Sequence, residues 1–122
     1  MTELTQESAR EIVALYHQAE REPGAAPPAL GMTPVEEFAV EASARGLTEP
    51  GFDWMNWAPY QDGRISDPDF IASADATTLR RIATAHLRLD RFAGGHLEAV
   101  EENGILGAVV DRLKHLADSD AL

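Results

Sequence analysis

The 122-residue chain contains no cysteine, which excludes a disulfide framework, a thiolate metal site and a cysteine nucleophile. It also lacks any apolar run long enough to span a membrane. Basic residues are scarce, because ten lysines and arginines stand against twenty-one acidic residues, giving a formal net charge of -11. This charge repels phosphate backbones and anionic membranes, so we expect no direct binding to nucleic acid or to a membrane.

The remaining composition is that of a single soluble domain. Hydrophobic residues make up 44% and charged residues 25% of the chain, both ordinary values for a globular protein. A chain of this length buries an adequate core without metals or disulfides. Residues 1–7 lack the basic and apolar regions of a signal peptide, so the expected location is the cytoplasm.

Helical spacing of apolar residues predicts two helices in the N-terminal half. The first covers residues 6–22 and is capped by Thr5, with Ile12 and Tyr16 on its apolar face. Residues 23–32 read as a Pro/Gly linker. A second helix begins at the sequence Thr-Pro-Val-Glu of residues 33–36, which combines an N-cap, a proline at the first position and a capping box.

Three further helices are predicted in the C-terminal half. The first, at residues 76–92, is capped by Asp75; shorter segments follow at 96–102 and 105–117. No stretch alternates between apolar and polar residues in the manner of a strand. We therefore predict an all-α fold with one domain over 1–122, a compact bundle of about four main helices plus short helical turns. Its helical core covers 33–118, with a long aromatic-rich loop at 47–74 packed on it.

Four of the eight aromatic residues lie within nine positions of that loop: Phe52, Trp54, Trp57 and Tyr60. These side chains either anchor the segment to the core or form the wall of a pocket. Anchoring is favoured, because each buried tryptophan stabilises a fold by about 2–3 kcal/mol. We accordingly predict that Trp57→Ala is strongly destabilising.

A set of residues between positions 50 and 117 resembles a family of small bacterial proteins of unknown function. The resemblance implies a common fold and carries no activity, and residues 1–45 lie outside it. The upstream marker is Asp53-Trp54 with Trp57. The downstream residues are Ala74-Asp75, Leu79, Thr84-Ala85, Arg88, Arg91-Phe92, Gly95, Leu97, Gly104 and Arg112-Leu113.

His86 and Asp90 are candidate catalytic residues on the predicted helix 76–92. A helical wheel places both in the middle of its apolar face, four residues apart, where a carboxylate can bond to an imidazole. A buried aspartate requires such a partner, because desolvating an unpaired charge is very unfavourable. The pair is therefore either an internal polar contact that fixes the loop to the helix or a proton-transfer site in a cleft.

A second candidate site combines arginines with the aromatic loop. Arg88 and Arg91 lie on the other faces of the same helix, and either guanidinium can stack on a ring or grip a carboxylate. One hypothesis is an anion site in which Arg91 holds a ligand against Trp54 or Trp57. The other is a structural contact in which Arg91 ties together Asp53 and other acidic or carbonyl groups of the loop.

The sequence offers little support for a metal or cofactor. The four histidines, at positions 17, 86, 96 and 115, form no HExxH-type pair, and the aspartates at 67, 69 and 75 lack the spacing of a calcium loop. We therefore expect no metal and no cofactor.

Three functional hypotheses remain open. The leading one is a non-enzymatic protein-interaction or regulatory module, acting on a protein partner or through a homodimer. The second is a small enzyme or anionic-ligand binding domain whose pocket lies between residues 47–74 and 76–92. The third is an acidic mimic of nucleic acid, which ranks last because the acidic residues are spread over all the predicted helices.

Overall fold

The computed structural model describes residues 4–21, 34–49, 51–89 and 96–119, and these residues contain helices and no strand. The predicted all-α class is confirmed. In chain order the helices are α1 (Gln6–Arg21), α2 (Pro34–Ala44), η2 (Trp54–Asn56), α3 (Ala58–Gln61), η3 (Arg64–Ser66), α4 (Pro68–Ala72), α5 (Ala76–Leu89), α6 (His96–Glu102) and α7 (Ile105–Asp118).

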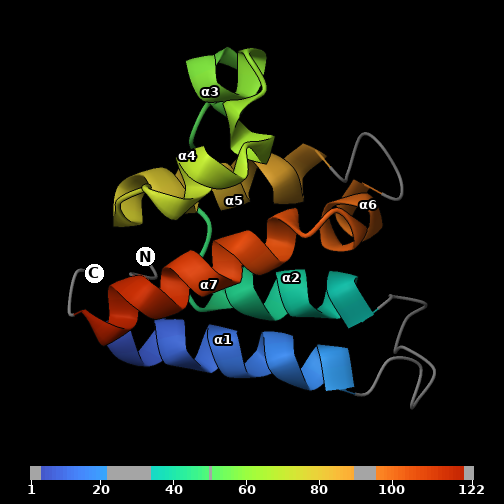
Figure 1. Cartoon of the computed structure of the whole chain (residues 1–122), viewed down its shortest axis with the longest axis vertical. Helices are drawn as coiled ribbons and strands as arrows, with labels where there is room; N and C mark the ends of the chain where they lie inside the picture. The colour runs from blue at the N-terminus through green and yellow to red at the C-terminus, as the bar shows by residue number, and fades with distance from the viewer. Residues whose placement is uncertain (1–3, 22–33, 50, 90–95, 120–122) are drawn as a thin grey trace.

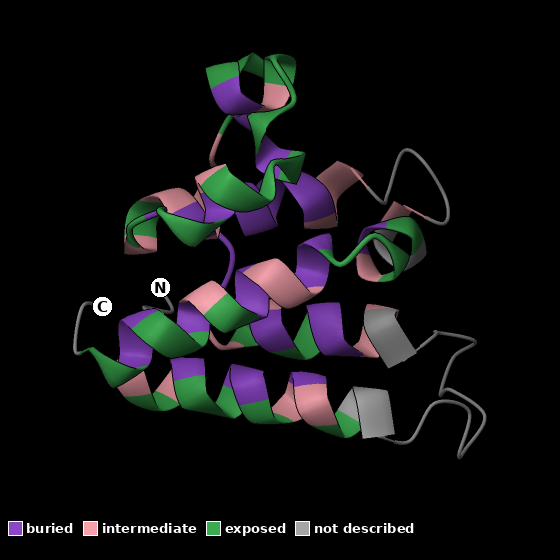
Figure 2. Ribbon diagram, viewed as in Figure 1, coloured by how far each residue is buried: buried purple, intermediate pink, exposed green. Residues whose placement is uncertain are grey.

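Helix α7 lies at the centre of the bundle. It contacts α1 on one side and α4, α5 and α6 on others, and it runs antiparallel to α1 (Figure 1). Buried residues recur along the whole length of α7 (Figure 2). Its buried residues are Ile105, Leu106, Val109, Val110, Leu113, Leu116 and Ala117.

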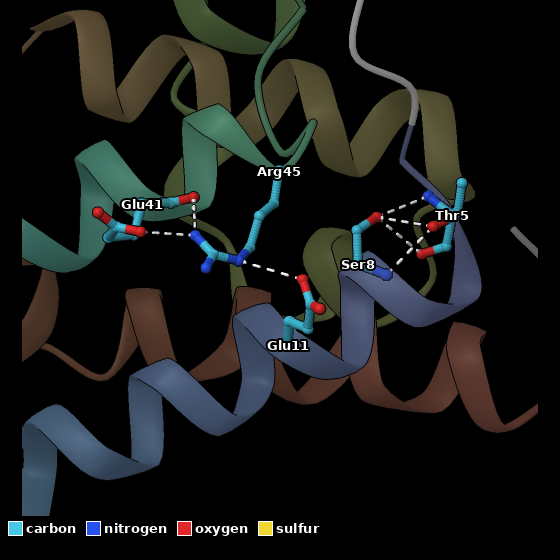
Figure 3. Close-up of polar contacts among 5 residues, drawn as sticks. All are labelled: Thr5, Ser8, Glu11, Glu41 and Arg45. Atoms are coloured by element: carbon cyan, nitrogen blue, oxygen red, sulfur yellow. Dashed lines mark hydrogen bonds and ion pairs between the residues drawn. The ribbon is translucent and has the colours of Figure 1, made fainter.

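Helix α1 begins at the predicted cap. The backbone N–H of Ser8 donates to Oγ1 of Thr5 at 3.1 Å, and the N–H of Thr5 donates to Oγ of Ser8 at 2.8 Å. This reciprocal arrangement satisfies two amides that the first turn leaves free. Farther along, Arg45 joins α1 to α2, donating to Glu11 at 3.2 Å and to Glu41 at 2.7 Å (Figure 3). Both glutamates hold the pKa of Arg45 above its usual value, with the Glu41 hydrogen bond the largest cause.

The predicted linker 23–32 and the Thr33 cap of α2 lie outside the described residues, as do positions 90–92 and the Gly94-Gly95 break. Helices α5, α6 and α7 otherwise follow the predicted ranges closely. The predicted cap of α5 is confirmed, because the Thr78 N–H donates to Asp75 at 2.8 Å.

Residues 47–74 pack onto the bundle as expected, but they are less loop-like than the sequence suggested. Four short helices, η2, α3, η3 and α4, fill most of the segment. Prolines stand in the first turns of α3 and α4, where a missing amide is harmless. Gly63, with φ of 86°, provides the left-handed turn between α3 and η3, and Asp67 caps α4 by accepting from the Asp69 N–H.

We call residues 51–66 the aromatic lobe. It includes η2, α3 and η3, and α3 packs mainly against the other two. The lobe therefore stands at one end of the molecule, beyond the layer that contains α4 and α5 (Figure 1). Its attachment to the bundle is through η2 and η3, which both contact α5. Within the described part of the chain, every helix is too short or too polar to traverse a bilayer.

Candidate functional site

His86 is fixed at the point where the aromatic lobe, α5 and α6 meet. Its side chain is 2% exposed. One ring nitrogen, Nε2, lies 2.7 Å from the carbonyl oxygen of Ile65 in η3. The other, Nδ1, lies 3.2 Å from Nε2 of His96, the first residue of α6. One buried imidazole therefore connects three elements.

These contacts determine where the protons lie on His86. A carbonyl oxygen only accepts, so Nε2 of His86 carries a hydrogen and donates it to Ile65. When His86 is neutral, Nδ1 is then an acceptor and the Nε2–H of His96 donates to it. The pKa of His86 is lowered chiefly by burial; the Ile65 bond opposes this shift and the charge of His96 adds to it. The neutral form is thus the one the fold favours.

Arg80 and Thr84 attach the segment that follows α2 to the surface of α5. Arg80 donates through Nε to the Gly46 carbonyl at 2.9 Å and through Nη2 to the Thr48 carbonyl at 3.0 Å. The buried Thr84 hydroxyl accepts from the Glu49 N–H at 2.9 Å and donates to the Arg80 carbonyl at 2.7 Å. The chain therefore enters the aromatic lobe from a fixed position.

Arg81 begins a chain of aromatic contacts that runs into the lobe. Its guanidinium lies over the Phe52 ring at 4.7 Å and pairs with Glu49 at 2.9 Å. Phe52 in turn meets Trp57 edge to face, with centroids 5.4 Å apart. A second edge-to-face pair joins Trp54 and Tyr60 at 4.9 Å. The lobe is held by two aromatic pairs, each of a geometry that adds to simple burial.

The tryptophans of the proposed anion site are placed differently from one another. Trp54 is buried in the core at 8% exposure, whereas Trp57 is half-buried and packs at the edge of the core. Asp53 is exposed and accepts a hydrogen bond from Asn56 at 2.6 Å. Arg88 is half-buried on α5. The remaining candidates, Asp90 and Arg91, lie outside the described residues.

Two residues that were not proposed for these sites make contacts there. His96 is a hydrogen-bond partner of His86, and the guanidinium of Arg81 lies over the Phe52 ring of the lobe. A contact between two residues one turn apart on the same helix can be predicted from their spacing in the sequence. The His86–His96 contact depends on how α6 packs against α5, which no local pattern in the sequence predicts.

The described residues hold no cluster of three or more histidine, aspartate or glutamate side chains that suits a metal ion. What the lobe does present is apolar surface. Met55 is 48% exposed on η2, and Val40, on α2, is the other large apolar side chain exposed among the described residues, at 55%.

The whole of this helical bundle and lobe is covered by one known family. Residues 1–119 match the family of unknown function DUF6508, so α1 and α2, which lay outside the expected resemblance, are part of it. None of the curated proteins and none of the solved structures matches the chain significantly. The chain belongs to the DUF6508 family of unknown function.

Proposed function

We propose that this protein is a non-enzymatic protein-interaction module that binds its partner through the aromatic lobe. The observation that carries the proposal is the position of the aromatic residues. The lobe stands at the end of the bundle, yet it concentrates half-buried Phe52, Trp57 and Tyr60 beside an exposed Met55 (Figure 1). Aromatic residues and methionine are enriched at protein interfaces relative to the rest of a surface.

The lobe is also pre-organised for binding. Its edge-to-face pairs and the Arg81–Phe52 contact restrict the side chains that would meet a partner. Ordering a flexible side chain on association opposes binding by about 0.5–1.5 kcal/mol, and this penalty is smaller where the side chain is already fixed. A rigid aromatic knob therefore suits recognition better than a loose loop of the same composition.

The polar contacts beneath the lobe support a structural role more than a catalytic one. Both ring nitrogens of His86 have partners within the protein. Arg81 already pairs with a carboxylate, that of Glu49, in the place where an anionic ligand would compete for it. These contacts favour the interaction module over the enzyme or anion-binding alternative.

Charge indicates the chemistry of the partner. The exposed acidic residues of the lobe and of α4 with its N-cap are Asp53, Asp62, Asp67 and Asp69. The one basic residue among them, Arg64, is already paired with Asp62 at 2.8 Å. We infer a partner whose surface offers an apolar pocket bordered by basic residues. Self-association through this surface is disfavoured, because it would bring two acidic borders together.

The proposal is tested with a matched pair of surface variants. Met55→Lys places a positive charge on the lobe, and Val40→Lys places the same charge on a similarly exposed apolar position of α2. Proteins retained from a lysate of the native host by the wild type are identified, purified and titrated against all three proteins by calorimetry. We expect Val40→Lys to bind as the wild type does and Met55→Lys to bind at least tenfold more weakly. Equal affinities for the wild type and Met55→Lys would refute the lobe as the binding surface.

A further inference from the structure

We propose that the His86–His96 pair is a pH-dependent link between α6 and the aromatic lobe, closed near neutral pH and opened by acid. Its effect on partner binding rests on the function proposed above, whereas the link itself is a property of the folded protein. The geometry places the pair where such a link must act. His86 contacts the lobe through Ile65, and His96 belongs to α6.

The link depends on the number of protons that the two rings share. With both rings neutral, His96 donates to Nδ1 of His86. One added proton leaves this bond intact, because either ring can donate to the other when only one of the two is charged. When both rings are charged, however, two N–H groups face each other across the 3.2 Å that now holds a hydrogen bond. Two imidazolium cations at this distance also repel each other in a poorly solvated site.

The groups around His86 give its cation little support. His96 is the titratable group of α6 that faces it, and its charge lowers the pKa of His86 further.

On η3, Arg64 is turned toward Asp62 and the Phe70 ring. On α7, Arg112 donates to the Ala74 carbonyl. On α5 itself, Arg80 and Arg81 are directed to residues 46–49. Next to η2, Asp53 is exposed and bonded to Asn56.

The direction of the pH effect follows from the lowered pKa. The folded protein binds a proton at His86 more weakly than the unfolded chain does, for which the ordinary value is 6.5. The contribution of the pair to stability is therefore fully present above that value and decreases as the pH falls from it toward the lower pKa of the folded state. Proton binding at low pH therefore favours the state in which the two imidazole rings are separated.

Opening the link loosens the lobe. Ile65 is 4% exposed, and its carbonyl would lose its bond to the imidazole when His86 turns toward water. The lobe contains both tryptophans of the protein, so its environment is reported by their emission. Helices α1, α2 and α7 lie in the rest of the bundle, so the helical signal in far-ultraviolet circular dichroism is retained when the lobe alone moves.

The test compares tryptophan emission from pH 7.5 to pH 5 in three proteins. In His96→Gln the side-chain amide does not titrate and can either donate to neutral His86 or accept from charged His86. The control is His115→Gln, which removes an exposed histidine of α7. We expect a red shift below pH 6.5 in the wild type and in His115→Gln, with circular dichroism unchanged, and a flat profile in His96→Gln. A shift of the same size in His96→Gln, or no shift in the wild type, would overturn the link.

The two proposals fail separately. If the emission change occurs as expected but Met55→Lys binds partners normally, the link stands and the lobe is not the binding surface. If Met55→Lys abolishes binding and the emission profile is flat, the binding surface stands without pH control. Where both proposals hold, the affinity of the wild type for its partner is lower at pH 5.5 than at pH 7.5, and the affinity of His96→Gln is the same at both pH values.

Discussion

The hydroxyl of Tyr16 lies 3.0 and 2.9 Å from the two carboxylate oxygens of Glu101, although 85 residues separate them in the chain. Tyr16 is buried in α1 and Glu101 is half-buried in α6, so the contact joins two helices of the bundle with a charge-assisted bond. We expect Tyr16→Phe to lower the free energy of unfolding by about 1–2 kcal/mol, as measured by urea denaturation. Glu101→Gln, which retains an acceptor, should have a smaller effect.

Gly107 of α7 is coupled to that hydroxyl. A methyl group at position 107 would lie 3.3 Å from the Tyr16 oxygen, a close but not prohibitive distance. Alanine in a helix is favoured over glycine by up to about 1 kcal/mol. We therefore predict that Gly107→Ala stabilises a Tyr16→Phe background more than the wild type. Equal increments in the two backgrounds, measured by a double-mutant cycle, would show that the positions are independent.

The two tryptophans should differ in their effect on stability. Trp54 is buried in the core, so Trp54→Ala is expected to lower stability by about 3–5 kcal/mol. Trp57 remains a predicted anchor, but it is half-buried at the edge of the core, so we expect Trp57→Ala to lower stability by about 2 kcal/mol. Thermal unfolding of both variants shows which substitution lowers stability more. A larger loss of stability in Trp57→Ala than in Trp54→Ala would contradict the structure.

Arg80 should not tolerate replacement by lysine. Its guanidinium donates to two separate carbonyls, those of Gly46 and Thr48, and a lysine ammonium lacks the fixed fork that reaches both. We expect Arg80→Lys to lower stability by about 1 kcal/mol. Arg88→Lys, at a half-buried position on the same helix, is the matched control and should change stability less.

Asp75 gives a second pH dependence, in the acid range. Its pKa is lowered from 3.8, mainly by the backbone hydrogen bond from Thr78. The carboxylate therefore contributes stability above that pH, and this contribution is lost as the pH falls through the lowered pKa. We expect Asp75→Ala to lower stability by about 1 kcal/mol at pH 7. Asp75→Asn, which still caps the helix, should be close to the wild type at pH 7 and show less acid dependence.

The sequence was sufficient for α1, α2, α5, α6 and α7 because the signals of these helices are local. Thr5, Asp67 and Asp75 each act on amides two or three residues away, and apolar spacing repeats within each helix. The buried position of His86 was predictable for the same reason.

The partners in the candidate site depend on how the helices meet. His96 reaches His86 because α6 packs beside α5, and Arg81 reaches Phe52 because the segment after α2 is fastened to α5 by Arg80 and Thr84. Periodicity along one helix does not contain this information. The short helix α4 was predicted from its Asp67 cap and Pro68. The helices η2, α3 and η3 were missed because each is only three or four residues long, too short for an apolar repeat to develop.

The central place of α7 has a consequence for how the protein forms in the cell. Helices α1, α4, α5 and α6 all pack against α7, which the ribosome makes after every one of them. Until residues 105–118 have left the ribosome, the apolar faces of the earlier helices lack their common partner, and the emerging chain remains exposed to chaperones and proteases. Folding of this bundle should therefore be a late event that occurs in one step, and chains truncated before α7 should be degraded instead of accumulating as partly folded domains.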